Sequence, residues 1–319
     1  MPKGEESFLK AFVKVLTVLV LLICSSVLLF GCSILEQHGK PNIDNNGTNN
    51  KMNKYERENY VSIQKYTGEG FTLRNANKKI DGIIEKNRED IVMAVETFFD
   101  SQYHTDVKVH NIVSAIDAAT VFVESIGEPH FYTNAIVPID VKKNIVHTSN
   151  VWSEEGQVED GISCGLYVTA YEEEFKKLDH ILENLADEYP IVGTPTKVTE
   201  RVKGNGYTTP YYFISGFGAL FKDLFHKFME NPSITKKELN DFLSQNEFEY
   251  SGLSLGIEFY MEDQGQKPSE EIHHAIIKAI EEAEGIPNGE YFVFLNDNFI
   301  DRKRGIGKKE NSLEKVIVK

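Results

Sequence analysis

An uncharged apolar run near the N-terminus constrains the chain more than any other feature. Residues 15–30 read VLTVLVLLICSSVLLF, without a single charge, and three lysines precede them. At about 1.5 Å per helical residue the run spans only ~24 Å, which is short for a bilayer core of about 30 Å. A basic start, a short apolar run and a small residue at its end, here Gly31, are typical of a secretory signal. We therefore predict that residues 1–31 are a signal peptide.

The residue that follows this run is Cys32, and the quartet Leu29-Phe30-Gly31-Cys32 resembles a lipobox. The resemblance implies that a diacylglyceryl group joins the sulfur of Cys32 and that the chain is cleaved ahead of it. Because stable attachment takes more than one lipid chain, such a cysteine would hold the protein at the extracytoplasmic face of the cell membrane. Phe30 departs from the lipobox pattern, in which a small or β-branched residue is usual. An uncleaved anchor over residues 15–35 therefore remains the alternative.

The segment after Cys32 lacks the apolar groups that a fold needs. Residues 33–58 are rich in Asn and Lys and cannot bury enough surface to order themselves. We therefore predict a flexible polar tether over residues 32–59, followed by a folded body. A polar, acidic stretch at residues 150–160 divides this body into an N-terminal half, 60–149, and a C-terminal half, 150–319.

Both halves predict an α+β fold, in which helices pack on antiparallel sheets. In the N-terminal half, apolar spacing predicts a helix over 80–103 and strands over 107–113, 120–124, 131–139 and 144–147. In the C-terminal half it predicts helices over 162–189, 217–228, 235–245 and 268–283 and strands over 253–261 and 291–295. The third of these helices begins with a capping box, Thr235 to Glu238.

The chain is acidic, with a formal net charge of -15. Such a body is a poor partner for nucleic acid, whose phosphates require clustered Lys and Arg. We therefore predict no nucleic-acid partner. A basic cluster near the C-terminus could touch anionic lipid or wall polymer, or pair with the protein's own carboxylates. It comprises Arg302, Lys303, Arg304, Lys308 and Lys309.

Beyond the signal and the lipidated cysteine, Cys164 is the only thiol, so the body can contain no internal disulfide. Cys164 lies near a predicted helix start, where the helix dipole could activate it as a nucleophile. That chemistry needs a histidine base, and nothing in the sequence places His147 or His180 beside it. Because a lone cysteine is more often a small buried apolar residue, we predict no catalytic residue.

Two clusters offer metal ligands without a recognised binding motif. Glu270 and His274 share a face of a predicted helix, but the adjacent His273 points about 100° away. We interpret this cluster as a solvated polar face. The second cluster gathers oxygen ligands without the glycine and glutamate of a calcium loop, and we interpret it as a turn. It comprises Asn296, Asp297, Asn298 and Asp301. We predict no metal and no cofactor.

An aromatic cluster beside flexible glycines is the strongest sequence candidate for a ligand-binding surface. It comprises Tyr207, Tyr211, Tyr212 and Phe213. Aromatic side chains on glycine-flexed backbone can build a recognition groove. The next aromatic residues follow helical spacing, and we predict that they belong to the core. They are Phe217, Phe221 and Phe225.

Two strings carry a resemblance to a known family. They read YTGEGFTLRN at residues 66–75 and VFVESIGEPHFY at residues 121–132. Together with the lipobox they resemble a family of Gram-positive surface lipoproteins classed as a domain of unknown function. The resemblance is strongest over residues 60–140 and implies no activity, cofactor or catalytic residue.

Three functional hypotheses follow. The leading one is a non-enzymatic lipoprotein, held to the membrane through Cys32, whose body binds a small ligand or another envelope protein. The second is a cell-envelope hydrolase that uses Cys164 or a pair of carboxylates. The third is an inert structural component of the surface.

Overall fold

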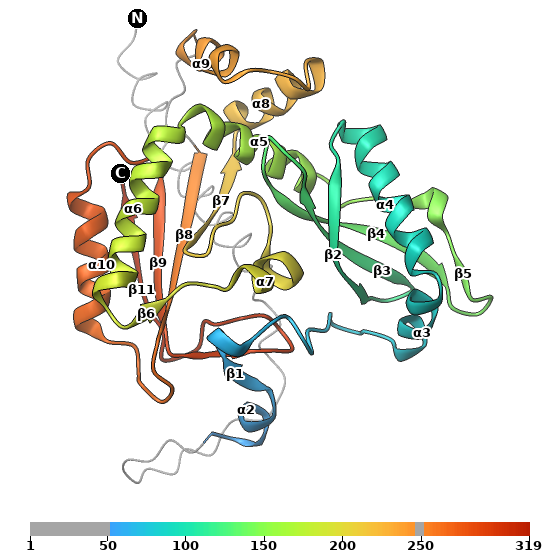
Figure 1. The fold of residues 1–319 in the computed structure, drawn as a ribbon, viewed down its shortest axis with the longest axis horizontal. Helices are drawn as coiled ribbons and strands as arrows, with labels where there is room; N and C mark the ends of the chain where they lie inside the picture. Colours follow the sequence, from blue (N-terminus) through green and yellow to red (C-terminus); the bar gives the residue numbers. More distant parts are fainter. Residues whose placement is uncertain (1–51, 246–251) are drawn as a thin grey trace, which may run out of the picture. The chain divides into compact units, whose positions relative to one another are not determined.

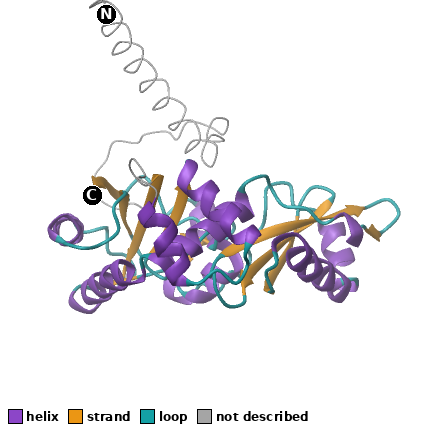
Figure 2. Ribbon diagram, turned by 90° about the horizontal axis from the view of Figure 1, so that it is seen from above, coloured by secondary structure: helices purple, strands orange, loops and turns teal. Residues whose placement is uncertain are grey.

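Two β-sheets organise the fold, and helices cover a face of each (Figure 1). The computed structural model describes residues 52–245 and 252–319. The first sheet lies within the predicted N-terminal half and the second within the predicted C-terminal half. Figure 2 shows the helices beside the strands in a view turned by 90°. The predicted α+β class is therefore confirmed.

The first sheet is an antiparallel meander of four strands in the order β2-β3-β4-β5. They are β2 (Val107–Ser114), β3 (Ala118–Ser125), β4 (Tyr132–Asp140) and β5 (Ile145–Val146). Asp117 lies in the β2–β3 turn with a φ of 50°, a left-handed conformation that Asp tolerates better than most residues. Two helices pack on this sheet through buried isoleucine, valine and phenylalanine side chains. They are α3 (Lys78–Lys86) and α4 (Arg88–Tyr103).

The second sheet has five strands, and its longest strand pairs on both sides. They are β6 (Ile191–Val192), β7 (Tyr212–Phe217), β8 (Gly252–Met261), β9 (Glu290–Asn296) and β11 (Leu313–Val318). The order is β11-β9-β8, with β6 and β7 pairing along the other side of β8. Only β8 and β9 are parallel among the described strand pairs, and the crossover that a parallel pair requires is α10 (Glu270–Glu282). Helix α10 and helix α6 (Glu172–Glu188) pack on this sheet.

Helix α5 (Gln157–Ala170) joins the two sheets, because it contacts both β4 and β7. Gly165 permits this approach: a Cβ atom there would lie 2.7 Å from the carbonyl oxygen of His130. Helices α8 (Ala219–Glu230) and α9 (Lys236–Gln245) pack against α5. One hydrophobic core therefore runs through both sheets, from Val121 through Ile162 to Leu255.

Shorter elements close one end of the second sheet. Strand β1 (Tyr60–Ser62) pairs with β10 (Phe299–Asp301), and a small separate core lies beneath the pair. The remaining elements are α2 (Lys54–Asn59), η1 (Ile63–Lys65), η2 (Thr148–Asn150), α7 (Thr196–Val198) and the π-helix η3 (Thr199–Lys203).

Several sequence predictions need correction. The predicted helices over 80–103 and 162–189 are each two helices, because the chain turns at Asn87 and at Tyr171. The predicted tether over 32–59 is too long at its C-terminal end, since Asn53 caps helix α2 and β1 follows directly. Phe217 does not belong to a helix: it ends β7, and Gly218, with a φ of 93°, starts the turn into α8.

The signal peptide, Cys32 and the tether as far as residue 51 lie outside the described residues. Within residues 52–245 and 252–319, no helix has the length and apolar character needed to cross a bilayer.

Candidate functional site

The predicted aromatic cluster spans the loop before β7 and the start of that strand. Tyr212 lies in the core, where its ring stacks on Phe175 with a centroid distance of 6.2 Å. Tyr207 and Tyr211 are half-buried, and burial raises the pKa of Tyr207 to about 12. Phe213 is exposed, with its ring over Gly256 of the neighbouring strand. Tyr212 and Phe213 therefore point to opposite faces of the sheet, because successive strand residues alternate in direction.

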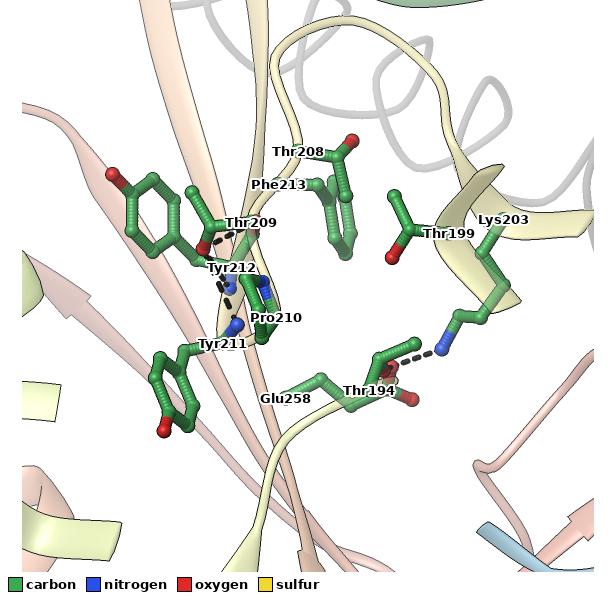
Figure 3. Close-up of a pocket in the computed structure, with 10 residues that line it drawn as sticks. All are labelled: Thr194, Thr199, Lys203, Thr208, Thr209, Pro210, Tyr211, Tyr212, Phe213 and Glu258. Carbon is green, nitrogen blue, oxygen red and sulfur yellow. Dashed lines mark hydrogen bonds and ion pairs between the residues drawn. The ribbon is translucent and has the colours of Figure 1, made fainter. Parts of the chain in front are cut away.

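A small pocket lies beside Tyr211, Tyr212 and Phe213 (Figure 3). Its cavity volume is about 20 Å³, which is room for about one water molecule and too small for an organic ligand. An ion pair between Lys203 and Glu258 lies in its wall, and these side chains are 19% and 15% exposed. Glu258 also accepts hydrogen bonds from the hydroxyl of Tyr260 at 3.0 Å, the amide of Asn296 at 3.2 Å and the hydroxyl of Thr194 at 3.5 Å. The charges of Lys203 and Glu258 are therefore already paired within the protein.

A larger groove of about 470 Å³ opens between α5, β7 and α8. Its apolar wall consists of Phe217, Phe221 and Phe225. Phe221 is buried against Gly216, whereas Phe217 is 55% exposed, so the prediction that Phe217 belongs to the core is wrong. The opposite wall is acidic, with Glu155, Glu159 and Asp160, and Lys222 and His226 complete the lining.

Two carboxylates of this groove lie in unusual surroundings. Asp160 accepts a hydrogen bond from the backbone N–H of Gly216 at 3.0 Å, but no cation pairs with it among the described residues. Burial raises the pKa of Asp160 above its ordinary value, and the hydrogen bond from Gly216 opposes this shift. In Glu159, Oε1 accepts a hydrogen bond from Tyr103 at 3.3 Å, whereas Oε2 is buried without a hydrogen-bond donor. A ligand with a positive group would match both carboxylates.

Cys164 lies on α5, directly behind Asp160, and is completely buried. Its thiol contacts Oδ1 of Asp160 at 3.7 Å. Burial, with the nearby Asp160 carboxylate, raises the pKa of Cys164 well above its ordinary value. Such a thiol is neither accessible nor ionised, so the thiol form of the hydrolase hypothesis loses its physical basis.

In the first of the two sequence clusters with possible metal ligands, Glu270 and His274 are exposed, as predicted for a solvated face, whereas His273 is not. His273 is buried against the second sheet, where Nε2 lies 3.4 Å from the carbonyl oxygen of Val293 and burial lowers the pKa of the ring. The interpretation of a solvated polar face is therefore wrong for His273. In the oxygen-rich turn, Asp297 pairs with Lys309 at 2.7 Å and Asp301 accepts a hydrogen bond from Tyr55 at 2.9 Å.

The two parts of the basic cluster near the C-terminus differ in their contacts. Lys308 and Lys309 pair with the protein's own carboxylates, Glu314 and Asp297. Arg302, Lys303 and Arg304 form no ion pair within the described residues.

A further cluster escaped the sequence analysis. His110, Glu124 and Glu200 come from β2, β3 and η3, and one ligand atom from each lies within 4.8 Å of the others. His110 and Glu124 are 14 positions apart in the sequence, and Glu124 and Glu200 are 76 positions apart. No short motif connects residues at such separations, so only the fold brings them together. The irregular backbone at two of the three positions left no signal in the apolar pattern.

Comparisons with known proteins place the chain in a family. Residues 53–319 match the model of the family described as "Protein of unknown function (DUF1672)". The chain is similar to the crystal structure of a DUF1672 family protein from Staphylococcus aureus subsp. aureus Mu50, with a TM-score of 0.66 and 18% identity. That similarity covers 82% of this chain and 98% of the other. No curated protein matches. Because the family model matches most of its length, the chain belongs to the DUF1672 family, whose function is unknown.

Proposed function

We propose that the protein is a non-enzymatic binding module, held at the extracytoplasmic face of the membrane by a lipid on Cys32. The groove of about 470 Å³ between α5, β7 and α8 carries the proposal of binding. It is the larger of the two described pockets, and a concave site with apolar walls and a few polar groups is the usual form of a binding site. The apolar run that ends at Cys32 supports the anchor.

The chemistry of the groove selects a class of ligand. Phe217 offers an exposed aromatic ring at one wall, and Glu159 and Asp160 offer negative charge at the other. A ligand that carries an apolar group beside an amino group would contact both walls. The carboxylate of Glu159 would turn toward the groove to accept a hydrogen bond from that amino group, because its buried Oε2 has no donor among the described residues.

A matched pair of probes tests the groove. Dodecylamine and dodecanoate share an alkyl chain and differ in the sign of their charge. We expect calorimetry below the critical micelle concentrations to show saturable binding of the amine and none of the carboxylate. Phe217→Ser and Asp160→Asn should weaken the binding of the amine. Met93→Ser is the control. Met93 lies on α4 and is 56% exposed, so this substitution removes an apolar side chain that is as exposed as Phe217 but lies outside the groove.

Equal binding in wild type and in both groove variants would refute the groove as the binding site. Absence of binding, together with absence of a stoichiometric partner after gentle solubilisation of membranes, would favour the inert structural role instead.

The anchor is tested separately by labelling cells with a fatty-acid analogue. We expect the wild-type chain to take up the label and Cys32→Ala to lose it. Label retained in Cys32→Ala would refute lipidation at this cysteine.

A second candidate function is the hydrolase that uses a pair of carboxylates. Glu159 and Asp160 line the same groove, and the raised pKa of Asp160 is a property of many acid catalysts. This hypothesis predicts release of soluble fragments from purified cell-wall material, abolished by Asp160→Asn. No release by the wild-type protein would exclude it.

A further inference from the structure

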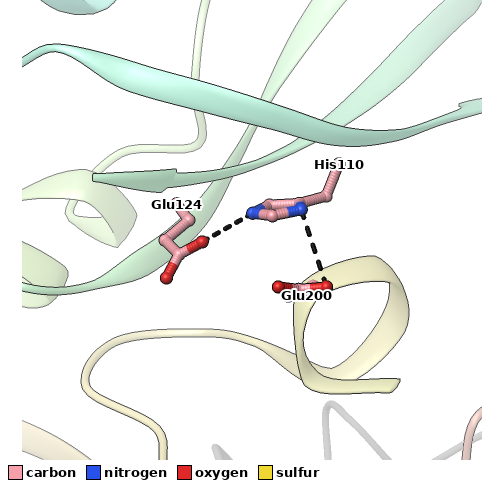
Figure 4. Close-up of side chains that lie close together, drawn as sticks. All are labelled: His110, Glu124 and Glu200. Carbon is pink, nitrogen blue, oxygen red and sulfur yellow. Dashed lines mark hydrogen bonds and ion pairs between the residues drawn. The ribbon is translucent and has the colours of Figure 1, made fainter. Parts of the chain in front are cut away.

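His110 occupies an irregular position in the first sheet. The pairing of β2 with β3 shifts between Val109 and Asn111, so His110 is the extra residue of a β-bulge and has no partner strand residue. Such bulges redirect a side chain and are frequent next to functional sites. The neighbouring Glu124 projects from β3 toward the ring of His110 (Figure 4).

The third residue comes from a different part of the chain. Glu200 lies on η3, a five-residue π-helix, which is a rare conformation that is frequent at functional sites. The side-chain amide of Asn111 donates a hydrogen bond of 2.9 Å to the carbonyl oxygen of Arg201. This contact ties η3 to β2 and brings Glu200 to the imidazole of His110.

The distances leave one carboxylate without a hydrogen bond. Nε2 of His110 lies 2.7 Å from Oε2 of Glu124, whereas Nδ1 lies 3.8 Å from Oε2 of Glu200. A separation of 3.8 Å is too long for a hydrogen bond. No other donor reaches the carboxylate of Glu200 among the described residues. The site therefore contains two carboxylates around an imidazole whose side chain is only 7% exposed.

Neighbouring side chains support Glu124 from behind. The hydroxyl of Tyr132 donates a hydrogen bond of 3.2 Å to Oε1 of Glu124. Nε2 of His130 lies 3.9 Å from the same oxygen, too far for a hydrogen bond. Metal ligands in proteins are oriented by outer hydrogen bonds such as the one from Tyr132.

We propose that His110, Glu124 and Glu200 bind a divalent transition-metal ion of the zinc class. One imidazole nitrogen with carboxylate oxygens suits zinc better than calcium or magnesium, which prefer oxygen alone. Zinc bonds of about 2.0–2.2 Å separate adjacent ligand atoms by roughly 3.0–3.5 Å. One imidazole gives a single ion only one of its two nitrogens, so the separations from Nε2 and from Nδ1 do not belong to one coordination sphere. The three ligand atoms lie within 4.8 Å of one another, and they reach the range of a zinc site only when the Glu200 carboxylate shifts. Glu200, which no donor holds in place, would turn its carboxylate toward the bound ion.

The bound ion would act as a cross-link. It would connect the β2–β3 hairpin to η3, two segments about 75 to 90 residues apart in the chain. An ion that binds only the folded chain raises the stability of that chain. The site is independent of the groove between α5, β7 and α8, because the two share no residue.

The test is a titration of the full chain, purified in detergent and stripped with a chelator, with zinc chloride alone. We expect one equivalent to bind and the melting temperature to rise with zinc concentration. Calcium chloride at the same concentration should change neither quantity. Failure of the wild-type chain to bind zinc at micromolar concentrations would overturn the proposal and leave an internal ion triad of His110 and two glutamates.

Two variants locate the ion. Glu200→Gln removes a carboxylate that makes no hydrogen bond, so it should fold normally and bind zinc at least about ten-fold more weakly. His110→Gln should abolish the rise in melting temperature. Glu96→Gln on α4 is the control, because it removes one exposed carboxylate that does not belong to the cluster. Equal zinc affinity in wild type and in Glu200→Gln would place the ion elsewhere and refute the site.

Discussion

The charged side chains at the two ends of η3 differ in how completely they are paired. At one end, Lys203 forms an ion pair with Glu258, whose carboxylate also accepts hydrogen bonds from Tyr260 and Asn296. Near the other end, Glu200 faces a histidine at 3.8 Å and receives no hydrogen bond from the described residues. One short segment therefore takes part in two polar networks. In the first, which we call closed, every charge has a partner; in the second, which we call open, a carboxylate has no hydrogen-bond donor among the described residues.

The difference separates residues that stabilise the fold from residues that can bind. A partly buried charge with a cation and several donors stabilises the local structure, and its removal leaves an uncompensated partner. A carboxylate without a donor contributes little to stability and is available to an ion or ligand. Four predictions test this distinction, in order of decreasing expected effect.

Replacing Lys203 by Met should have the largest effect. It leaves Glu258 largely buried without its cation, and we expect a loss of about 3 kcal/mol in the free energy of unfolding. Urea denaturation measures this loss. The double variant with Glu258→Gln should recover part of it, because no charge is then left unpaired. A loss below about 0.5 kcal/mol in the single variant would show that the network does not stabilise the fold.

Replacing Asn111 by Ala should have a smaller effect. The variant loses the hydrogen bond to the carbonyl of Arg201 and leaves that acceptor unsatisfied, at a cost of about 1 kcal/mol. We also expect faster amide hydrogen exchange in η3 than in the wild type. Unchanged exchange would mean that other contacts hold η3 against β2.

Asp160 provides a carboxylate of intermediate kind, with hydrogen bonds but no cation. Burial raises its pKa above the ordinary 3.8. The folded chain then holds this proton to higher pH than the unfolded chain, so the contribution of Asp160 to stability falls as pH rises through a window that begins near 3.8. The free energy of unfolding of wild type minus that of Asp160→Asn should therefore decrease as the pH rises above 3.8.

Replacing Glu200 by Gln should have the smallest effect on stability. In the absence of metal we expect a change within about 0.5 kcal/mol, because no hydrogen bond is lost. Denaturation after treatment with a chelator measures it. A loss of 2 kcal/mol or more, on the order of a broken buried pair, would mean that Glu200 already pairs with His110 and that the second network is closed too.

The regular elements were predictable because their apolar residues follow one period. The alternation over residues 107–113 and 131–139 predicted β2 and β4, and the capping box at Thr235 is present, with the backbone of Glu238 donating to the threonine hydroxyl at 3.3 Å. The breaks at Asn87 and Tyr171 were not predictable, since the apolar pattern continues across both. Strand β7 was assigned in part to a helix, because Phe217, Phe221 and Phe225 mimic helical spacing although the first belongs to a strand.

The sites were less predictable than the fold. The sequence predicted Phe213 as a binding residue, yet the larger groove is lined by Phe217, four residues further along β7, and by Asp160 of α5. The His110 cluster depends on a bulge in β2 and on a π-helix, and neither leaves a periodic signal. Residues separated by tens of positions meet only through tertiary structure.

The core that runs from Val121 through Ile162 to Leu255 has a consequence for how the body can be cut and combined. Removal of either sheet would expose the apolar surface of the other and of α5, so we expect neither the segment before residue 150 nor the segment after it to fold when expressed alone. Thermal unfolding should then follow a single cooperative transition. Any part of this protein that folds by itself should therefore contain both sheets together with α5.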